Sequence, residues 1–334
     1  MIFHPAVISL SAGSLLVSSM LLYASWFGAG ILRKWDLRSG SELQLNLERR
    51  TYLISTVLSY AFGFQLISFF LFVFTADHLH TLFTGAMCAA GTLNVNQYGY
   101  PAITMKVVNF ILVGLWLILN YTDNKAFDYP LIKKKYAALL ILMPLVLAET
   151  LLQGAFFFDL RAEVITSCCG SLFSADMESV ASDIASLPQG PLMTAFYACM
   201  TATVLLGILF YFKGRAGTLF SLLGVAAFFL STASLISFIS PYIYELPTHH
   251  CPFCVLQKEY WYAGYLHYLF LMGGVVCGAG TGLLMLFRRV PSLKDIIPAV
   301  QKSLALVSVV LYLLFTILVT AQIVFSGLRT EWYY

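Results

Sequence analysis

Charge is scarce in this sequence of 334 residues. Asp, Glu, Lys and Arg make up 10% of the residues and hydrophobic residues make up 60%, whereas soluble domains carry about 25% charge. A water-soluble fold has no means of hiding that much apolar surface, so the composition predicts a protein surrounded by lipid. The sequence also lacks a Walker loop, a Rossmann glycine fingerprint and a Cys-x-x-Cys-His haem-attachment motif. It therefore gives no sign of those sites, nor of a nucleic-acid partner.

Long apolar stretches dominate what is present. Eight of them reach the roughly 20 residues that a helix needs to cross the hydrocarbon core, and none alternates as a membrane barrel strand does. Because helices satisfy their own backbone hydrogen bonds in lipid, we predict an all-α polytopic bundle of about eight transmembrane helices. We expect it to form one integral membrane domain over residues 1–334, with the first stretch retained rather than cleaved as a signal peptide. The stretches are 6–32, 51–75, 102–120, 137–158, 192–212, 217–240, 261–287 and 303–326.

Basic residues mark alternate connections between these stretches. Fifteen of the nineteen Lys and Arg residues fall in four connections, which the positive-inside rule places in the cytoplasm, with both termini outside. The remaining connections, 76–101, 159–191 and 241–260, are then exterior, and we expect them to form a cap. This orientation predicts a protein of the bacterial inner membrane with its cap on the periplasmic side. The four basic connections are 33–50, 121–136, 213–216 and 288–302.

Sulfur gathers on the opposite face from the basic residues. Five of the seven cysteines lie in the three exterior connections, on the side of the membrane where thiols are oxidised. A histidine pair, His249 and His250, directly precedes two of them. The exterior face is therefore where chemistry is expected. The five cysteines are Cys88, Cys168, Cys169, Cys251 and Cys254.

The segment HHCPFCVLQKEYWYAGYLHY, residues 249–268, contains a Cys-x-x-Cys pair. Pro252 suits the first turn of a helix, so we expect Cys251 to cap a helix whose first turn carries Cys254. Free N–H groups at the start of a helix stabilise a thiolate, and the Cys-x-x-Cys spacing does so as well. A permanent structural disulfide is less favoured, because so small a ring is often strained. A redox pair and a metal clamp both remain open.

A Cys-x-x-Cys pair that opens an apolar helix at the outer face resembles the vitamin K epoxide reductases and the bacterial quinone-linked disulfide-forming membrane proteins. The resemblance covers about twenty residues. It implies a thiol–disulfide oxidoreductase in which Cys251 and Cys254 form the redox-active pair beside a lipid quinone. It also implies that the other exterior cysteines, Cys88, Cys168 and Cys169, relay electrons from an exterior thiol protein.

The same side chains permit a second interpretation, a soft-metal site. Thiolates combined with imidazole suit zinc or copper(I). Such a site would belong to a metal transporter or to a non-catalytic subunit of a larger membrane complex. The candidate ligands are Cys88, Cys168, Cys169, Cys251, Cys254, His249 and His250.

Polar side chains inside the predicted spans are further candidates, because the hydrocarbon core disfavours charge. Glu149 lies in the outer half of the fourth span, and Lys106 enters the third span from the same side. We expect them either to pair with each other or to transfer protons to a quinone. Trp261, Tyr265 and His267, near the start of the seventh span, either belong to an aromatic belt at the membrane surface or form the wall of a quinone site.

Overall fold

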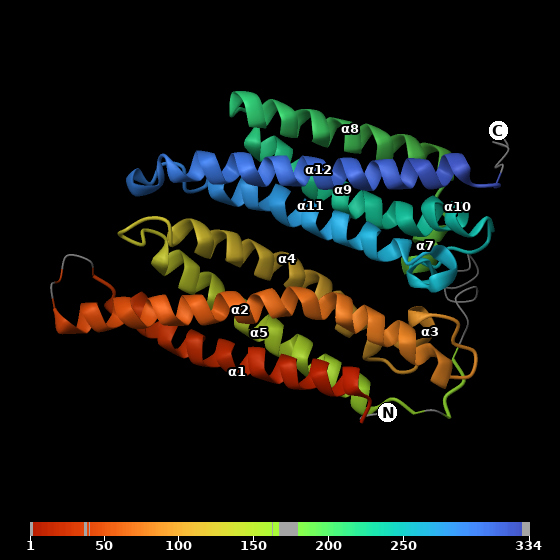
Figure 1. Ribbon diagram of the computed structural model, residues 1–334, viewed down its shortest axis with the longest axis horizontal. Coiled ribbons are helices and arrows are strands. Elements are labelled where there is room, and N and C mark those ends of the chain that lie inside the picture. The colour runs from red at the N-terminus through yellow and green to blue at the C-terminus, as the bar shows by residue number, and fades with distance from the viewer. Residues whose placement is uncertain (1–2, 37–38, 40, 162, 167–179, 329–334) are drawn as a thin grey trace. The chain divides into compact units, whose positions relative to one another are not determined.

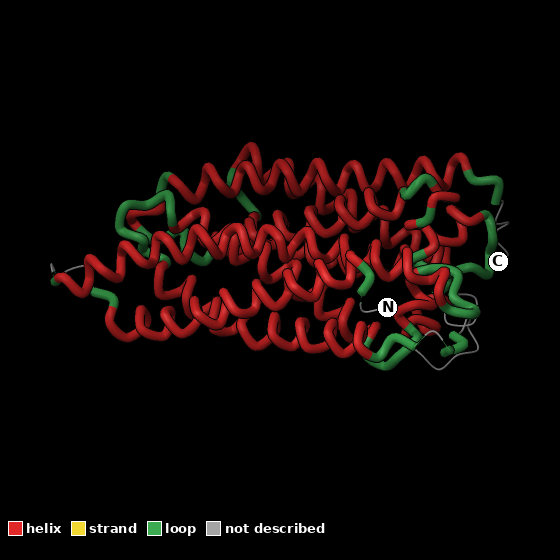
Figure 2. Tube along the Cα trace, turned by 60° about the horizontal axis from the view of Figure 1, so that its bottom comes forward, coloured by secondary structure: helices red, strands yellow, loops and turns green. Residues whose placement is uncertain are grey.

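The chain folds entirely into helices and their connections. The computed structural model describes residues 3–36, 39, 41–161, 163–166 and 180–328, and within these residues there is no strand (Figure 2). Eight of the described helices are long and apolar enough to cross a membrane. The prediction of an all-α polytopic bundle is therefore confirmed, and the protein is an integral membrane protein whose surroundings are a lipid bilayer.

The helices belong to two compact units, with the first four spans mainly in one and the last four in the other. Three long helices contribute residues to both units: α2 (Glu42–His78), α11 (Ala263–Met285) and α12 (Ile296–Phe325). The second unit contains most of the three connections that were predicted to be exterior. The first unit comprises Met1–Phe72, Asn96–Leu160 and Leu283–Gln301, and the second comprises Val73–Val95, Arg161–Gly282 and Lys302–Tyr334.

The first unit is built from α1 (Pro5–Lys34), most of α2, α4 (Gly99–Asp123) and α5 (Ile132–Phe158). Helix α5 packs along both α1 and α4 (Figure 1). Aliphatic and aromatic residues together form the shared core, where Phe62 and Trp116 meet edge to face with their ring centroids 5.0 Å apart. The core therefore joins all four helices of this unit.

Helix α2 begins nine residues before the predicted apolar stretch, at Glu42 rather than at residue 51. The Ser41 hydroxyl accepts the backbone N–H of Gln44 at 3.3 Å, which is the bond that caps the start of a helix. The Gln44 side chain then donates to Glu48 at 2.8 Å, one turn further on. A capping sequence and polar side-chain pairs thus extend the helix beyond the membrane-crossing part.

The basic connection between α4 and α5 is also shorter than predicted, because Lys135 lies inside α5. Its ammonium group pairs with Asp123 at 2.9 Å, and both side chains are fully buried. The other carboxylate oxygen of Asp123 accepts the backbone N–H of Leu131 at 2.8 Å. One buried carboxylate therefore fixes both ends of this connection.

The second unit contains most of the four remaining spans and the short elements of the three connections predicted to be exterior. The spans are α8 (Gln189–Lys213), α9 (Gly217–Ser234) continued by the π-helical turn η2 (Leu235–Ile239) and α10 (Ser240–Tyr244), α11 (Ala263–Met285), and α12. The short elements are η1 (Leu79–Leu82), α3 (Ala89–Leu93), α7 (Val180–Ala185), η3 (Cys254–Leu256) and η4 (Lys258–Tyr260).

Glycines spaced four residues apart line one side of α11. A Cβ atom at Gly274 would lie 3.0 Å from the Tyr312 ring, and one at Gly278 would lie 3.1 Å from the Ser308 hydroxyl. That hydroxyl donates to the Gly274 carbonyl at 2.8 Å, which ties α12 to α11. Small residues at this spacing let membrane helices approach closely. The close packing of α11 against α12 therefore depends on the absence of side chains at Gly274 and Gly278.

Candidate functional site

Three cysteines from two distant segments converge in the second unit. The sulfur atoms of Cys88, Cys251 and Cys254 all lie within 4.8 Å of one another. Cys88 Sγ and Cys251 Sγ are 3.6 Å apart, although 163 residues separate them in the chain. All three side chains are buried, with exposed fractions of 0%, 0% and 5%. We call this group the sulfur cluster.

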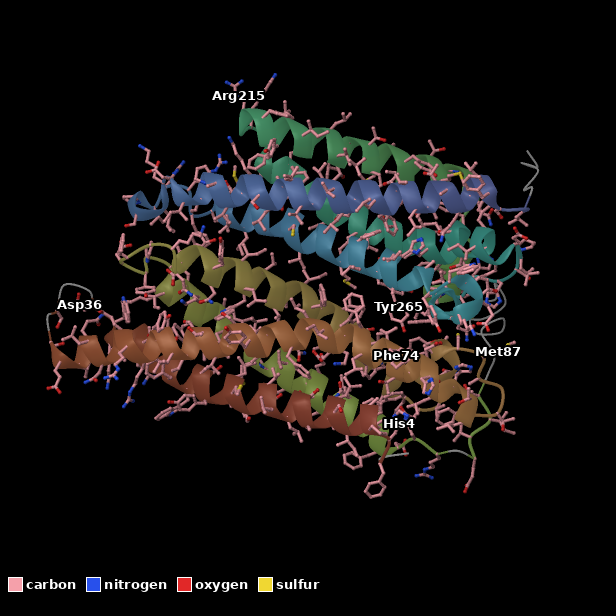
Figure 3. The ribbon with its side chains drawn as sticks, in the orientation of Figure 1. His4, Asp36, Phe74, Met87, Arg215 and Tyr265 are labelled. Atoms are coloured by element: carbon pink, nitrogen blue, oxygen red, sulfur yellow. The ribbon has the colours of Figure 1, made fainter. Side chains whose placement is uncertain are left out.

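Cys88 directly precedes α3 and has an extended backbone. Asp77, in the last turn of α2, accepts the backbone N–H of Ala89 at 3.1 Å. The segment that carries Cys88 is thereby attached to the end of a transmembrane helix. A second attachment comes from Gln257, whose side chain donates to the Met87 carbonyl. Figure 3 labels Met87 and, on α11, Tyr265, which mark this end of the second unit.

The Cys-Pro-Phe-Cys segment does not open a transmembrane helix, so that prediction is wrong. Cys254 begins the short 3₁₀ turn η3, and α11 starts only at Ala263. Between them, Trp261 and Tyr262 adopt left-handed conformations with φ of 56° and 55°. Such conformations are rare for bulky residues and interrupt a helix. The helix N-terminus expected beside Cys251 is therefore absent from this described segment.

Two tyrosines explain why the helix does not form there. In an α-helix the carbonyls of Cys251 and Pro252 would accept N–H groups four residues later. Here they accept the hydroxyls of Tyr244, at 2.6 Å, and Tyr268, at 2.5 Å. Tertiary hydrogen bonds thus replace the intrahelical ones. The start of α11 then packs against η3, since a Cβ at Gly264 would lie 2.7 Å from the Val255 side chain.

The two histidines before Cys251 have different roles. His249 Nε2 lies 3.3 Å from Cys254 Sγ, which brings an imidazole to the edge of the sulfur cluster. His250 Nδ1 instead lies 3.0 Å from the Ile236 carbonyl and 3.1 Å from that of Ser237, both in η2. A carbonyl only accepts, so this nitrogen carries a proton and stabilises the π-helical turn. His249 is the histidine available to the cluster.

Aromatic side chains surround the sulfur cluster. The Tyr244 ring meets the His249 ring edge-on at 4.6 Å and the Tyr260 ring at 4.7 Å. Phe253 and Ile236 pack against the same group. Burial raises the pKa of Tyr260, and negative charge at Cys254 and Glu259 raises it further. Tyr260 therefore stays neutral at physiological pH, and the surroundings remain apolar.

Three residues proposed from the sequence for a quinone site lie just before α11 or in its first turns, and they differ in how far they are exposed. Trp261 is 91% exposed, as suits an anchor at the membrane surface. His267 is fully buried, with Nδ1 2.8 Å from the Ala263 carbonyl and its ring edge-on to Phe315. Tyr265 lies on the first turn of α11 (Figure 3).

Lys106 and Glu149 form an ion pair within the first unit, which is one of the two alternatives expected from the sequence. Lys106 Nζ lies 2.7 Å from Glu149 Oε1, and both side chains are almost fully buried. Asn109 donates to the same carboxylate at 2.6 Å, and Gln65 donates to both of its oxygens at 2.8 Å. The sequence places Asn109 one turn from Lys106, but it gives no signal that Gln65, on another helix, completes the group.

The remaining four cysteines fall into two pairs. Cys168 and Cys169 fall outside the described residues. Cys199 lies in α8 and Cys277 in α11, and neither belongs to the group of converging ligand atoms. These two cysteines therefore serve as internal controls for experiments on the sulfur cluster.

No family model matches the chain, and no curated protein or solved structure matches it either. The function is therefore argued from the side chains that the fold brings together.

Proposed function

We propose that the protein binds a soft metal ion, zinc or copper(I), at the sulfur cluster. The observation that carries this proposal is the spacing of the sulfurs. A tetrahedral zinc ion with Zn–S bonds of about 2.3 Å holds its sulfur ligands about 3.8 Å apart. The 3.6 Å between Cys88 Sγ and Cys251 Sγ is close to that value, and Cys254 Sγ lies within 4.8 Å of both.

The surroundings of the cluster support the same proposal. Thiolates buried among aromatic rings are unfavourable unless a cation compensates their charge. A soft metal ion supplies that charge and prefers thiolate ligands. His249, 3.3 Å from Cys254 Sγ, is placed to act as a fourth ligand or to orient Cys254.

The burial of the three sulfurs indicates whether a bound ion would be retained or transported. Structural zinc sites are closed by four protein ligands, whereas sites that exchange a ligand keep one coordination position open. All three cysteines are nearly inaccessible. We therefore favour a retained ion that joins the segment after α2 to the segment after α10, in a membrane subunit rather than a metal transporter.

Elemental analysis of the purified protein tests this proposal. We expect about one zinc or copper ion per chain, which Cys88→Ser and Cys251→Ser lose and the controls Cys199→Ser and Cys277→Ser retain. Because a ligand that binds only the folded state stabilises it, a strong chelator should lower the Tm of the wild type but not of Cys88→Ser. Metal-free wild-type protein, or equal loss in the control variants, would refute the proposal.

A second candidate function, a quinone-linked thiol–disulfide oxidoreductase, rests on the close approach of Cys88 to Cys251. Oxidation of the Cys251 and Cys254 thiols to a disulfide would release two electrons and two protons, which a lipid quinone accepts to become a quinol. Attack of the Cys88 thiolate on Cys251 Sγ would then form a Cys88–Cys251 disulfide and release the Cys254 thiolate. An exterior thiol protein would supply the electrons that reset the enzyme.

Non-reducing mass spectrometry separates the two candidates. In Cys88→Ser, the redox function predicts an accumulated Cys251–Cys254 disulfide, because the thiol that attacks this disulfide is missing. The metal function predicts a metal-depleted protein in which those two cysteines are alkylated after anaerobic purification. The second result, together with metal in the wild type, would exclude the redox candidate.

We also propose that the sulfur cluster faces the periplasm of a bacterial inner membrane, as the distribution of basic residues indicates. Two exposed positions test this orientation: Leu246 in the connection before the sulfur cluster, and Lys294 in a basic connection. Each is replaced by cysteine in a separate variant. In intact cells, a membrane-impermeant maleimide should label Leu246→Cys and should label Lys294→Cys only after permeabilisation. The opposite labelling pattern would reverse the orientation.

A further inference from the structure

A long groove runs between α1 and α2 in the first unit, apart from the sulfur cluster. Its widest part, with a volume of about 820 Å³, lies near the ends of the helices that the α1–α2 connection joins. Two narrower hollows follow along the same pair of helices. Arg50 lines both the widest part and the first of these hollows, and Met20 and Val57 line both hollows. The three hollows therefore form one continuous groove.

Phe64 lies across the seam between α1 and α2 at the last hollow. A Cβ atom at Gly13 would overlap the Phe64 ring, so the absence of a side chain there lets the ring approach α1. Both residues line the last hollow. The groove thus has its widest part at one end and an aromatic ring near the other.

Charge is confined to the mouth. Arg33, Lys34 and Arg50 line the wide part together with one acidic residue, Glu42. Among the residues that the structure describes, no carboxylate forms an ion pair with these three cations. Nitrogen atoms of side chains gather at this end of α1 and α2, which Asp36 marks in Figure 3. Beyond Arg50 the lining is almost entirely apolar.

The part of the groove between its mouth and Met20 fits one leaflet of a bilayer. Lys34 and Met20 are 14 residues apart on α1, which corresponds to about 21 Å along the helix. Half of a bilayer, with its headgroup region, measures about 20–22 Å. A cationic mouth at the level of the headgroups and an apolar channel of that length match a molecule with an anionic head and an acyl tail.

We propose that this groove binds an anionic phospholipid. The phosphate would lie against Arg33, Lys34 and Arg50, and an acyl chain would run past Met20 and Val57 towards Phe64. Basic pockets between transmembrane helices bind anionic headgroups in this way. An apolar transmembrane helix from a partner protein fits less well, because it would bury the three cations without an anion to match them.

Native mass spectrometry in detergent, with added lipid, tests the proposal. We expect phosphatidylglycerol to bind more tightly than phosphatidylcholine. Arg33→Gln combined with Arg50→Gln should weaken phosphatidylglycerol binding about 30-fold, or about fivefold for each cation removed. The control is Lys213→Gln combined with Arg215→Gln, an exposed basic pair in the α8–α9 turn, which should change little.

Two further experiments identify what occupies the groove. Val57→Trp, at a position that is 46% exposed, should fill the apolar channel and weaken binding without changing charge. Inorganic phosphate should fail to displace the lipid, because it lacks the acyl chain. Equal binding of both lipids, full displacement by phosphate, an equal loss in the control pair, or a partner protein that co-purifies and is lost with Val57→Trp would each overturn the proposal.

Discussion

Replacing Glu149 by Gln should lower the free energy of unfolding by about 3–5 kcal/mol, because it leaves the buried ammonium of Lys106 without its counterion. Three side chains donate to this carboxylate: Lys106, Gln65 and Asn109. A glutamine amide would present a donor where these donors need acceptors. The expected loss is a large fraction of the 5–15 kcal/mol that stabilises a typical protein.

A double-mutant cycle measures the coupling directly. Lys106→Met alone should also destabilise, whereas Lys106→Met combined with Glu149→Gln should recover part of the loss, since no unpaired charge then remains buried. Unfolding in mixed detergent micelles gives the free energies, and Glu42→Gln serves as the control with an exposed carboxylate in the same unit. If the losses in the free energy of unfolding were additive, the coupling between Lys106 and Glu149 would be zero and the ion pair would not contribute to stability.

Gly278→Leu should destabilise the second unit by about 3 kcal/mol, at the upper end of the cost of overpacking. Even a Cβ at this position would lie 3.1 Å from the Ser308 hydroxyl, and that hydroxyl bonds to the Gly274 carbonyl. A leucine side chain would push α12 away and break the interhelical bond. Thermal unfolding in detergent should show a lower Tm together with weaker metal retention at the sulfur cluster.

Gly154→Leu is the matched control, because nothing lies within 4 Å of a Cβ atom at that glycine in α5. It should be neutral or slightly stabilising, since leucine favours a helix more than glycine does. Equal destabilisation by the two substitutions would mean that the close approach of α11 and α12 is not what Gly278 provides.

The sequence predicts the transmembrane spans well because their signal is local. An apolar run of sufficient length leaves few alternatives to a helix in lipid. The ends of the helices are less predictable, because polar residues decide them. The cap at Ser41 extends α2 well past its apolar run, and the pair of Lys135 with Asp123 draws a basic residue into α5.

The sequence predicted which residues belong to the candidate site but not how they are arranged. The orientation predicted from the basic residues places Cys88 and the Cys-Pro-Phe-Cys segment on one face of the membrane. Their close approach, however, depends on contacts between segments 163 residues apart. The predicted helix at Cys251 failed because hydroxyls from Tyr244 and Tyr268 bind the carbonyls that the helix would need. These hydroxyls come from residues 7 and 16 positions away from the carbonyls, which is outside the spacing of helix hydrogen bonds, so the helix pattern does not predict them.

The cysteines of the sulfur cluster are synthesised at different times, because Cys88 precedes Cys251 by 163 residues. A ribosome adds roughly 5–20 residues per second, so the 163 residues between Cys88 and Cys251 take roughly 8–33 s to synthesise. Throughout that interval Cys88 has been synthesised and Cys251 does not yet exist. The early thiol therefore has no partner at Cys251 until the sixth span and the connection that follows it have been made.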